Sequence, residues 1–263
     1  MRRTVLTLAY TPILFASPLL AQRGNPSPAD QSAIIRAVRD YALSYTKSMP
    51  NYTCTLTTRE VAMPPNAGNQ LQPSLTKIEE QLSFFNGKEL RKVTRIDGQP
   101  ASAEEADRLP ETTRGEFASL LDAIFEPATG ADLVWTRAAT LNKLKVDVIA
   151  FRVPQVHGYG LNGTRGSLRV PFEGFVYADA QTHAVIRLQL KCVMIPPDFE
   201  MQNFDLTLDY KATRVAGHEA ILPSHFVLHY RDFADDRQHS DDGQFSAYLQ
   251  FASSADIEFD GAK

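Results

Sequence analysis

Cysteines and the short motifs of familiar enzymes are scarce or missing in this chain. Its 263 residues include two cysteines, and no G-x-S-x-G, H-E-x-x-H or C-x-x-C pattern occurs. Each of these patterns would point to a definite chemistry: a nucleophilic serine, a zinc protease or a redox pair. The sequence therefore predicts no catalytic residue, no metal ligand and no cofactor, and it favours a protein that is not an enzyme.

Positive charge is also limited. The chain has 27 Lys and Arg against 31 Asp and Glu, a formal net charge of −4, and no block of basic residues. Proteins that bind nucleic acid usually present a basic patch to the phosphates. We therefore expect no nucleic-acid partner.

A long apolar run occurs at the N-terminus and nowhere else. Arg2 and Arg3 precede the run Thr4–Leu20, which ends at the small residue Ala21. This order is typical of a secretory signal peptide. Two prolines interrupt the run, and it is shorter than the roughly 20 apolar residues that a membrane span needs. The pattern therefore favours cleavage near Ala21 over an uncleaved anchor.

These features predict the domain organisation and the location. Residues 1–21 would be the signal peptide, and residues 22–263 a single domain of a length that suits one large β-rich fold. We expect an exported protein, periplasmic or extracellular, with no transmembrane segment in the mature chain.

The two cysteines are Cys54 and Cys192. Export to an oxidising compartment favours a disulfide between them. Two buried thiols are an alternative. A nucleophilic Cys54 is less well supported, because no partner histidine can be placed beside it.

Two stretches have apolar residues at helical spacing. In the first, Ser27, Pro28 and Asp30 form a helix start, and the helix should end by Met49. Pro127 should end the second. The apolar stripes are Ile34, Val38, Tyr41 and Tyr45 in the first helix, and Phe117, Leu120, Leu121 and Ile124 in the second. Each stripe should pack on a sheet.

The rest of the chain alternates apolar and polar residues from Tyr52 onward, nearly to a last strand at 255–260. Turn signals such as Asn86-Gly87 separate most of the runs. Short links require antiparallel neighbours. The predicted fold is α+β, a curved antiparallel meander sheet forming an incomplete barrel of about ten strands, with two main helices packed on one face.

Three segments are expected to be loops: 62–73, the glycine-rich 157–167 and the acid-rich 232–243. The second contains a G-x-G-x-x-G-like fragment, but strand-like sequence follows where a dinucleotide site needs a helix. The third could bind calcium, although its spacing does not match the EF-hand and turn residues explain its composition.

Histidines offer the remaining candidate chemistry. His225 and His229 are four residues apart in an alternating segment, so on a strand they would lie about 13 Å apart, too far to share one metal ion. They are expected on the outer face, with a general base as the alternative. Asp179, Thr182 and His183 look like an acid–hydroxyl–base group, but we expect a turn in which Asp179 and Thr182 bind nearby backbone groups and His183 is exposed.

The chain resembles a group of uncharacterised secreted proteins of acidobacterial type. The resemblance rests on "NYTCT", "FFNGKE", "GEFASLLDAIFEPATGADLVW", "GFVYADAQTHAVIRLQL" and "IPPDF". That group has no activity to carry over. More distantly, the pattern is similar to periplasmic lipoprotein carriers of the Lol type, whose hairpin pattern Asp179, Thr182, Arg187 and Leu188 match. This second resemblance implies an incomplete barrel with helices in its mouth that holds acyl chains, and it transfers no ligand-contacting residue.

The leading functional hypothesis is an exported envelope protein that binds a lipid, an acyl chain or another apolar ligand in a groove between sheet and helices. The two apolar stripes would line this groove, or they would complete a filled core. The first alternative is an envelope interaction or scaffold protein that uses segments 62–73 and 232–243 to bind a protein partner. The second is a hydrolase based on His157, His225 or His229.

Overall fold

The computed structural model describes residues 25–49, 51–64, 73–85, 88–107, 109, 119–163, 166–215, 217–234 and 236–250. The expected signal peptide, Phe117, the Asn86-Gly87 turn and the expected strand at 255–260 lie outside these residues.

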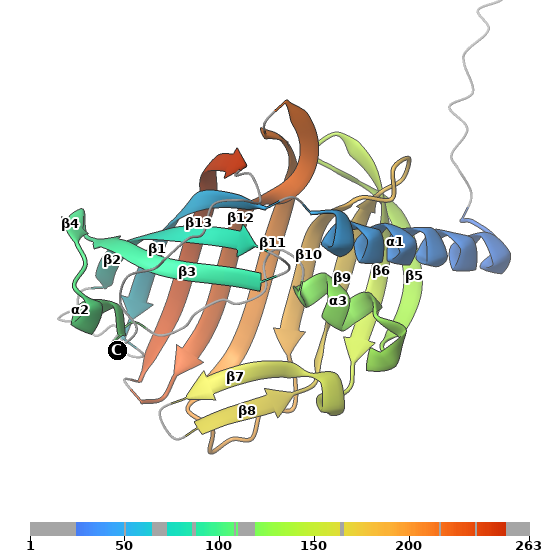
Figure 1. The fold of residues 1–263 in the computed structure, drawn as a ribbon. Coiled ribbons are helices and arrows are strands. Elements are labelled where there is room, and N and C mark those ends of the chain that lie inside the picture. Colours follow the sequence, from blue (N-terminus) through green and yellow to red (C-terminus); the bar gives the residue numbers. More distant parts are fainter. Residues whose placement is uncertain are drawn as a thin grey trace, which may run out of the picture.

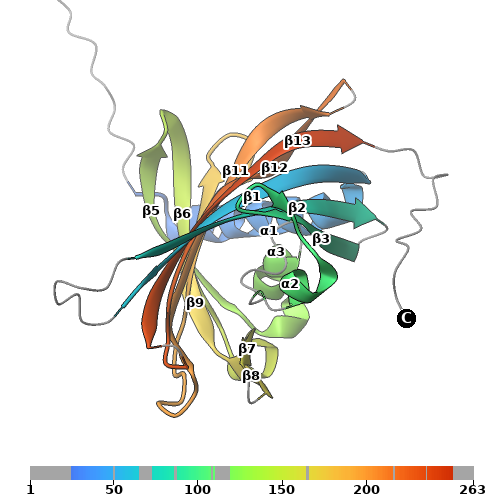
Figure 2. The same cartoon turned by 90° about the vertical axis from the view of Figure 1, so that its left-hand side faces the viewer.

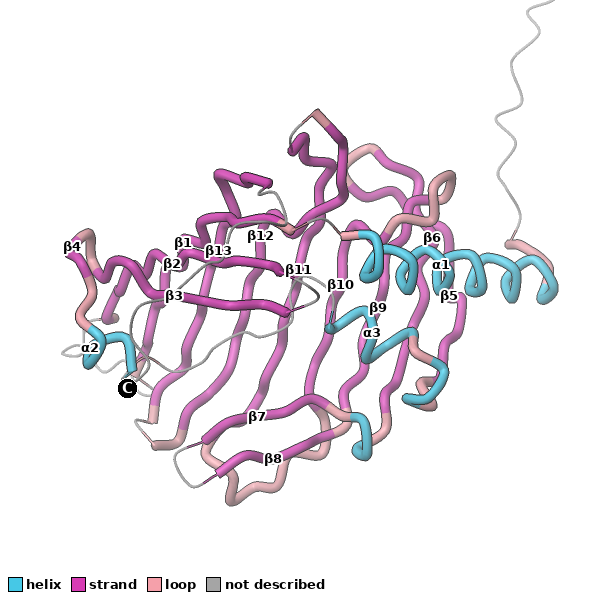
Figure 3. The backbone as a smooth tube through the Cα atoms, viewed as in Figure 1, coloured by secondary structure: helices cyan, strands magenta, loops and turns pink. Residues whose placement is uncertain are grey.

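Eleven strands form one antiparallel sheet, in the order β4-β3-β2-β1-β13-β12-β11-β10-β9-β6-β5 (Figures 1 and 3). They are β1 (Tyr52–Met63), β2 (Ser74–Phe85), β3 (Lys88–Ile96), β4 (Gln99–Pro100), β5 (Asp132–Leu141), β6 (Leu144–Val153), β9 (Phe172–Asp179), β10 (Val185–Cys192), β11 (Met201–Val215), β12 (His218–Asp232) and β13 (Arg237–Gln250). Two further strands, β7 (Tyr159–Gly163) and β8 (Gly166–Val170), form a separate hairpin. Among the described strands, β4 and β5 are the sheet edges, so the sheet is open.

The sheet consists of two meanders joined at one seam. Strands β1 to β4 follow one another outward to one edge, and the chain then starts again at the other edge with β5. The second meander returns inward until β13 pairs with β1. The first and last described strands are therefore neighbours, and the β1–β13 ladder alone connects β1–β4 to the rest of the sheet.

Three α-helices are described: α1 (Pro28–Ser48), α2 (Ala103–Asp107) and α3 (Ser119–Phe125). Ser27 and Asp30 form the expected capping box at the start of α1. The sheet curves around α1 and α3, which contact each other and pack on β5 and β6 respectively (Figure 2). The predicted fold class, an open curved antiparallel sheet with two main helices on one face, is confirmed.

The core lies between this concave face and the two helices. Val38 of α1 and Phe125 of α3 are fully buried against apolar strand residues such as Ile149 and Val176. Along β1, Tyr52, Cys54 and Leu56 alternate with less buried residues, as a strand with one covered face requires. None of the described helices combines the length and apolar character needed to cross a membrane.

Two segments expected to be loops are largely strands. The glycine-rich segment 157–167 contains β7 and the start of β8, and Pro171 separates β8 from β9. In the acid-rich segment, β12 runs to Asp232 and β13 begins at Arg237, so the link is only 233–236. Here β1 and β12 supply backbone partners on both sides of β13, and this tertiary pairing overrides the turn-like composition. Of segment 62–73, Ala62 and Met63 belong to β1, and 65–72 lie outside the described residues.

No disulfide joins Cys54 and Cys192, both of which are described and buried. Cys54 lies on β1 and Cys192 at the end of β10, with β13, β12 and β11 between them. Four steps across a sheet at about 4.8 Å each amount to roughly 19 Å. Two cysteines cannot be bridged when their Cα atoms lie more than about 7 Å apart. The predicted bond is therefore not confirmed, and burial raises the pKa of the Cys192 thiol.

Candidate functional site

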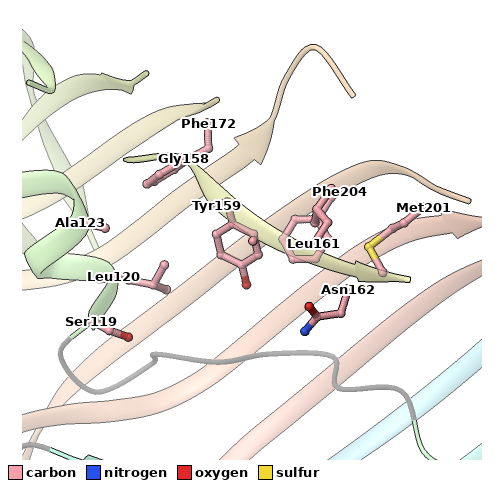
Figure 4. Close-up of a pocket in the computed structure, with 11 residues that line it drawn as sticks. Ser119, Leu120, Ala123, Gly158, Tyr159, Leu161, Asn162, Phe172, Met201 and Phe204 are labelled. Carbon is pink, nitrogen blue, oxygen red and sulfur yellow. The ribbon is translucent and has the colours of Figure 1, made fainter. Parts of the chain in front are cut away.

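A pocket of about 300 Å³ lies on the concave side of the sheet, between α3, the β7–β8 hairpin and the inner faces of β9 and β11 (Figure 4). It is lined by Ser119, Leu120 and Ala123 of α3, by Gly158, Tyr159, Gly160, Leu161 and Asn162 around β7, and by Phe172, Met201 and Phe204 of the sheet. Ligand pockets in proteins usually measure about 300–1,000 Å³, so this one is at the small end of the range.

Aromatic rings form the wall of the pocket on the sheet side. The ring of Tyr159 lies 5.0 Å from that of Phe204 and 6.1 Å from that of Phe172, the second pair edge to face. Phe172 also packs edge to face on Phe151, at 5.7 Å. Such contacts hold large apolar side chains in place. The wall is therefore built from residues of β7, β9 and β11, and Phe151 of β6 supports Phe172.

The hairpin that closes the pocket is held by close backbone approach and by side-chain hydrogen bonds. A Cβ atom at Gly158 would overlap the Val170 carbonyl, so this position needs glycine. Arg169 Nη1 donates to the Gly158 carbonyl at 2.9 Å, and Gln155 Nε2 donates to the Arg169 carbonyl at 3.2 Å. These contacts keep Tyr159 and Leu161 above the sheet.

The residues expected to line a groove have two different positions. Val38, Tyr45, Leu121 and Ile124 are buried, and Ile34 and Tyr41 are partly buried and pack against the same core. Leu120 lines the pocket. Most of the two stripes therefore completes a filled core, and the pocket opens beside it. Phe117 lies outside the described residues.

The sheet and hairpin residues of the pocket were not predicted from the sequence. Tyr159 and Leu161 alternate with the small or polar residues Gly160 and Asn162, which was the available sign of a strand. Phe172, Met201 and Phe204 look like ordinary core positions in the sequence. Only the folding of the hairpin over the sheet brings the two sets together.

The pocket offers apolar side chains together with a large share of neutral polar surface. The lining side chains that the structure describes carry no formal charge, and Ser119, Tyr159 and Asn162 supply hydroxyl and amide groups. This composition suits a ligand that combines an apolar part with hydrogen-bonding groups. The described residues include no group of three or more His, Cys, Asp or Glu side chains arranged to hold a metal ion.

The histidines of the hydrolase alternative are dispersed. Phe226, Leu228 and Tyr230 of β12 are buried, and His225 and His229 lie on its other face, as predicted. His225 Nε2 is 3.2 Å from Asp242 Oδ2, and its Nδ1 is 3.9 Å from Asp209 Oδ2. His157 lies in the 3₁₀ turn η2 (Gln155–His157). None of these three histidines lines the pocket.

The segment between β9 and β10 is the expected turn. Asp179 Oδ1 accepts hydrogen bonds from the backbone N–H groups of Gln181 and Thr182, at 2.9 and 2.8 Å. Thr182 Oγ1 accepts one from the Ala184 N–H at 3.3 Å. Burial raises the pKa of Asp179, but these hydrogen bonds outweigh burial and lower it. His183 adopts a positive φ of 62° and is partly buried, not fully exposed as expected.

Comparisons with known proteins bear on the fold. No family model and no curated protein sequence matches the chain. Among solved structures, it is similar to a DUF1329 family protein from Desulfovibrio piger, with 8% identity, a TM-score of 0.45 and coverage of 86% of this chain and 97% of that one. It is also similar to a putative outer membrane lipoprotein-sorting protein domain from Vibrio parahaemolyticus, with 9% identity, a TM-score of 0.45 and coverage of 85% and 94%.

A LolA superfamily protein from Nitrosomonas europaea is similar at 10% identity, with a TM-score of 0.36 and coverage of 84% and 94%. With TM-scores below 0.5 and identities of 8–10%, these likenesses assign neither a superfamily nor a function to this chain.

Proposed function

We propose that this chain is an exported envelope protein, cleaved near Ala21, whose single domain 22–263 binds one apolar chain or a small apolar ligand in the pocket beside α3. The observation that carries the proposal is the pocket of about 300 Å³ between Leu120, Tyr159 and Phe204. Its walls come from a helix, a hairpin and the sheet, and the described lining is uncharged. Removing apolar ligand surface from water is the driving force that such a lining supplies.

The size of the pocket limits what can bind. About 300 Å³ is at the lower limit for ligand pockets, so it suits a single acyl chain segment and not the whole of a two-chain lipid. Ser119 and Asn162 bring polar side chains to the pocket (Figure 4), and Asn162 Oδ1 accepts a hydrogen bond from Ser167 Oγ at 2.9 Å.

A fluorescent fatty-acid analogue tests the proposal. The delipidated mature protein should bind dansyl-undecanoic acid with a saturable rise and blue shift of the dansyl emission. Ala123 lines the pocket from α3, so Ala123→Phe should fill it and weaken binding at least tenfold. Ala33→Phe makes the same substitution at an exposed position on α1, and as the matched control it should bind as the wild type does.

Ligand binding and its assignment to this pocket are tested separately. Absence of saturable binding by the wild type, together with no lipid in native mass spectra of the protein as purified, would overturn ligand binding. Equal binding by wild type and Ala123→Phe would overturn the assignment to this pocket.

A further inference from the structure

The β1–β13 seam contains three ionisable side chains on its buried face. They are Glu60 of β1 and His239 and Asp241 of β13. Glu60 and Asp241 are direct cross-strand partners, and His239 Nδ1 lies 3.2 Å from Glu60 Oε1. The exposed fractions of the Glu60 and His239 side chains are 15% and 7%. Two carboxyl groups and one imidazole therefore share a nearly dry region of the sheet.

Asp241 is the unusual member of this group. It is fully buried, and among the residues that the structure describes neither of its carboxylate oxygens has a hydrogen-bond partner. Asp147, another buried aspartate, accepts a hydrogen bond from Trp135 Nε1 at 2.8 Å. An ionised carboxylate buried without hydrogen bonds costs several kcal/mol, whereas the neutral acid costs far less.

The surroundings of Asp241 also disfavour its charge. The ionisable groups that face it are Glu60 from β1, His239 from its own strand and Tyr230 from β12, and its β12 partner is Leu228. The Tyr230 ring stacks on His239 at 4.6 Å. His239 Nδ1 already contacts Glu60, so the two carboxyl groups share a single imidazole. Burial and the neighbouring carboxyl group therefore favour the protonated form of Asp241.

We propose that this cluster is a proton-controlled joint: the β1–β13 seam is held closed while Asp241 is protonated and loosens when Asp241 loses its proton. The proton matters because of where the cluster lies: among the described strands, this ladder alone connects β1–β4 to the rest of the sheet. Ionisation places two negative side chains opposite each other across that ladder, where like charges destabilise strand pairing.

The direction of the pH effect follows from linkage. Burial, and then Glu60, raise the pKa of Asp241 to about 7, while His239 opposes the shift. In an unfolded chain an aspartate loses its proton near pH 3.9. Between about pH 4 and pH 7 the folded protein binds more protons than the unfolded chain, so this group lowers the stability as the pH rises. Above about pH 7 its contribution levels off at the destabilised value.

The test compares the melting temperatures of the wild-type mature chain and Asp241→Asn between pH 5 and pH 8. The asparagine cannot ionise. The melting temperature of the variant should therefore rise relative to that of the wild type by about 5 °C or more between pH 5 and pH 8. Asp40→Asn, which removes an exposed aspartate on α1, is the control and should keep a constant difference from the wild type. A constant difference for Asp241→Asn would overturn the proposal.

A second variant keeps the test valid if Asp241→Asn does not fold. Glu60→Gln removes the neighbouring charge, so the loss of stability on raising the pH should move to lower pH. An unchanged midpoint would contradict the proposed coupling. Hydrogen exchange, corrected for intrinsic rates, should show peptides of β1 and β13 opening faster at pH 8.5 than at pH 5.5. Equal corrected rates at the two pH values would overturn the opening of the seam.

Discussion

The concave face of the sheet is buried in two different ways. Under α1 and α3 it is apolar, with Leu121 and Phe125 packed over strand residues such as Ile149. At the β1–β13 seam the same face buries Glu60, His239 and Asp241. Burial removes both surfaces from water, but it stabilises the first unconditionally and the second only in the right protonation state. The exposed fraction of a residue therefore does not show by itself what its burial contributes.

The largest effect is expected where the face is apolar. Phe125→Ala should lower the free energy of unfolding by about 3–5 kcal/mol, because Phe125 is fully buried and its truncation leaves a cavity. Urea unfolding followed by circular dichroism measures this, and the loss should be the same at pH 5.5 and pH 8.

Phe175→Ala is the matched control for that prediction. Phe175 lies on β9 with 38% of its surface exposed, so its truncation should cost less than about 1 kcal/mol. Equal losses for the two variants, or a loss at Phe125 that varies with pH, would contradict the contrast between the two regions.

A smaller effect is expected from packing at the seam. Gly243 of β13 lies under the Phe226 ring, which a Cβ atom would overlap. Gly243→Ala should therefore lower the free energy of unfolding by about 1–3 kcal/mol. Thermal or urea unfolding provides the measurement. At Gly160 a Cβ atom meets no atom within 4 Å, so Gly160→Ala should change stability by less than about 0.5 kcal/mol. If Gly243→Ala were equally neutral, the contact between β13 and Phe226 of β12 would be looser than described.

The smallest effect is expected for charges on the outer face. Arg187 Nε and Nη2 donate to the two carboxylate oxygens of Asp209, at 2.5 and 2.7 Å, and both side chains are about a quarter exposed or less. Arg187→Ala should cost about 0.5–1 kcal/mol in dilute buffer, and less in 1 M NaCl because salt screens exposed charges.

Salt therefore separates the two kinds of charge. The pH-dependent difference between wild type and Asp241→Asn should persist in 1 M NaCl, since a buried carboxyl group is poorly screened. Arg187→Lys keeps the charge but loses the bidentate geometry. It should therefore destabilise the protein, but less than Arg187→Ala does. The distinction between exposed and buried charges would be wrong if the cost of Arg187→Ala did not depend on salt. It would also be wrong if salt abolished the pH-dependent effect of Asp241→Asn.

The parts of the fold that depend on local interactions could be predicted. The helix start at Ser27 and Asp30 uses contacts three residues apart, and α1 begins where expected. The turn at Asp179 uses hydrogen bonds to Gln181 and Thr182, two and three residues further along the chain. The alternation of β12 placed Phe226 inside and His225 outside.

Other parts depend on partners distant in the sequence, and here the predictions failed or were incomplete. The acid-rich segment around Asp241 is strand because β1 and β12 pair with it on both sides. The glycine-rich segment becomes a hairpin that covers the sheet and brings Tyr159 to Phe204. No local sequence pattern indicates either of these contacts.

The sequence by itself thus determined the types of most elements, the antiparallel character of the sheet and the inner and outer faces of its strands, because helical and strand periodicity and turn chemistry act over a few residues. Only the tertiary structure decided that β13 returns to β1, that Leu120 lines a pocket while the other described residues of the two stripes do not, and that Asp241 is buried opposite Glu60. These features arise from contacts between segments far apart in the chain, where packing and backbone pairing outweigh local composition.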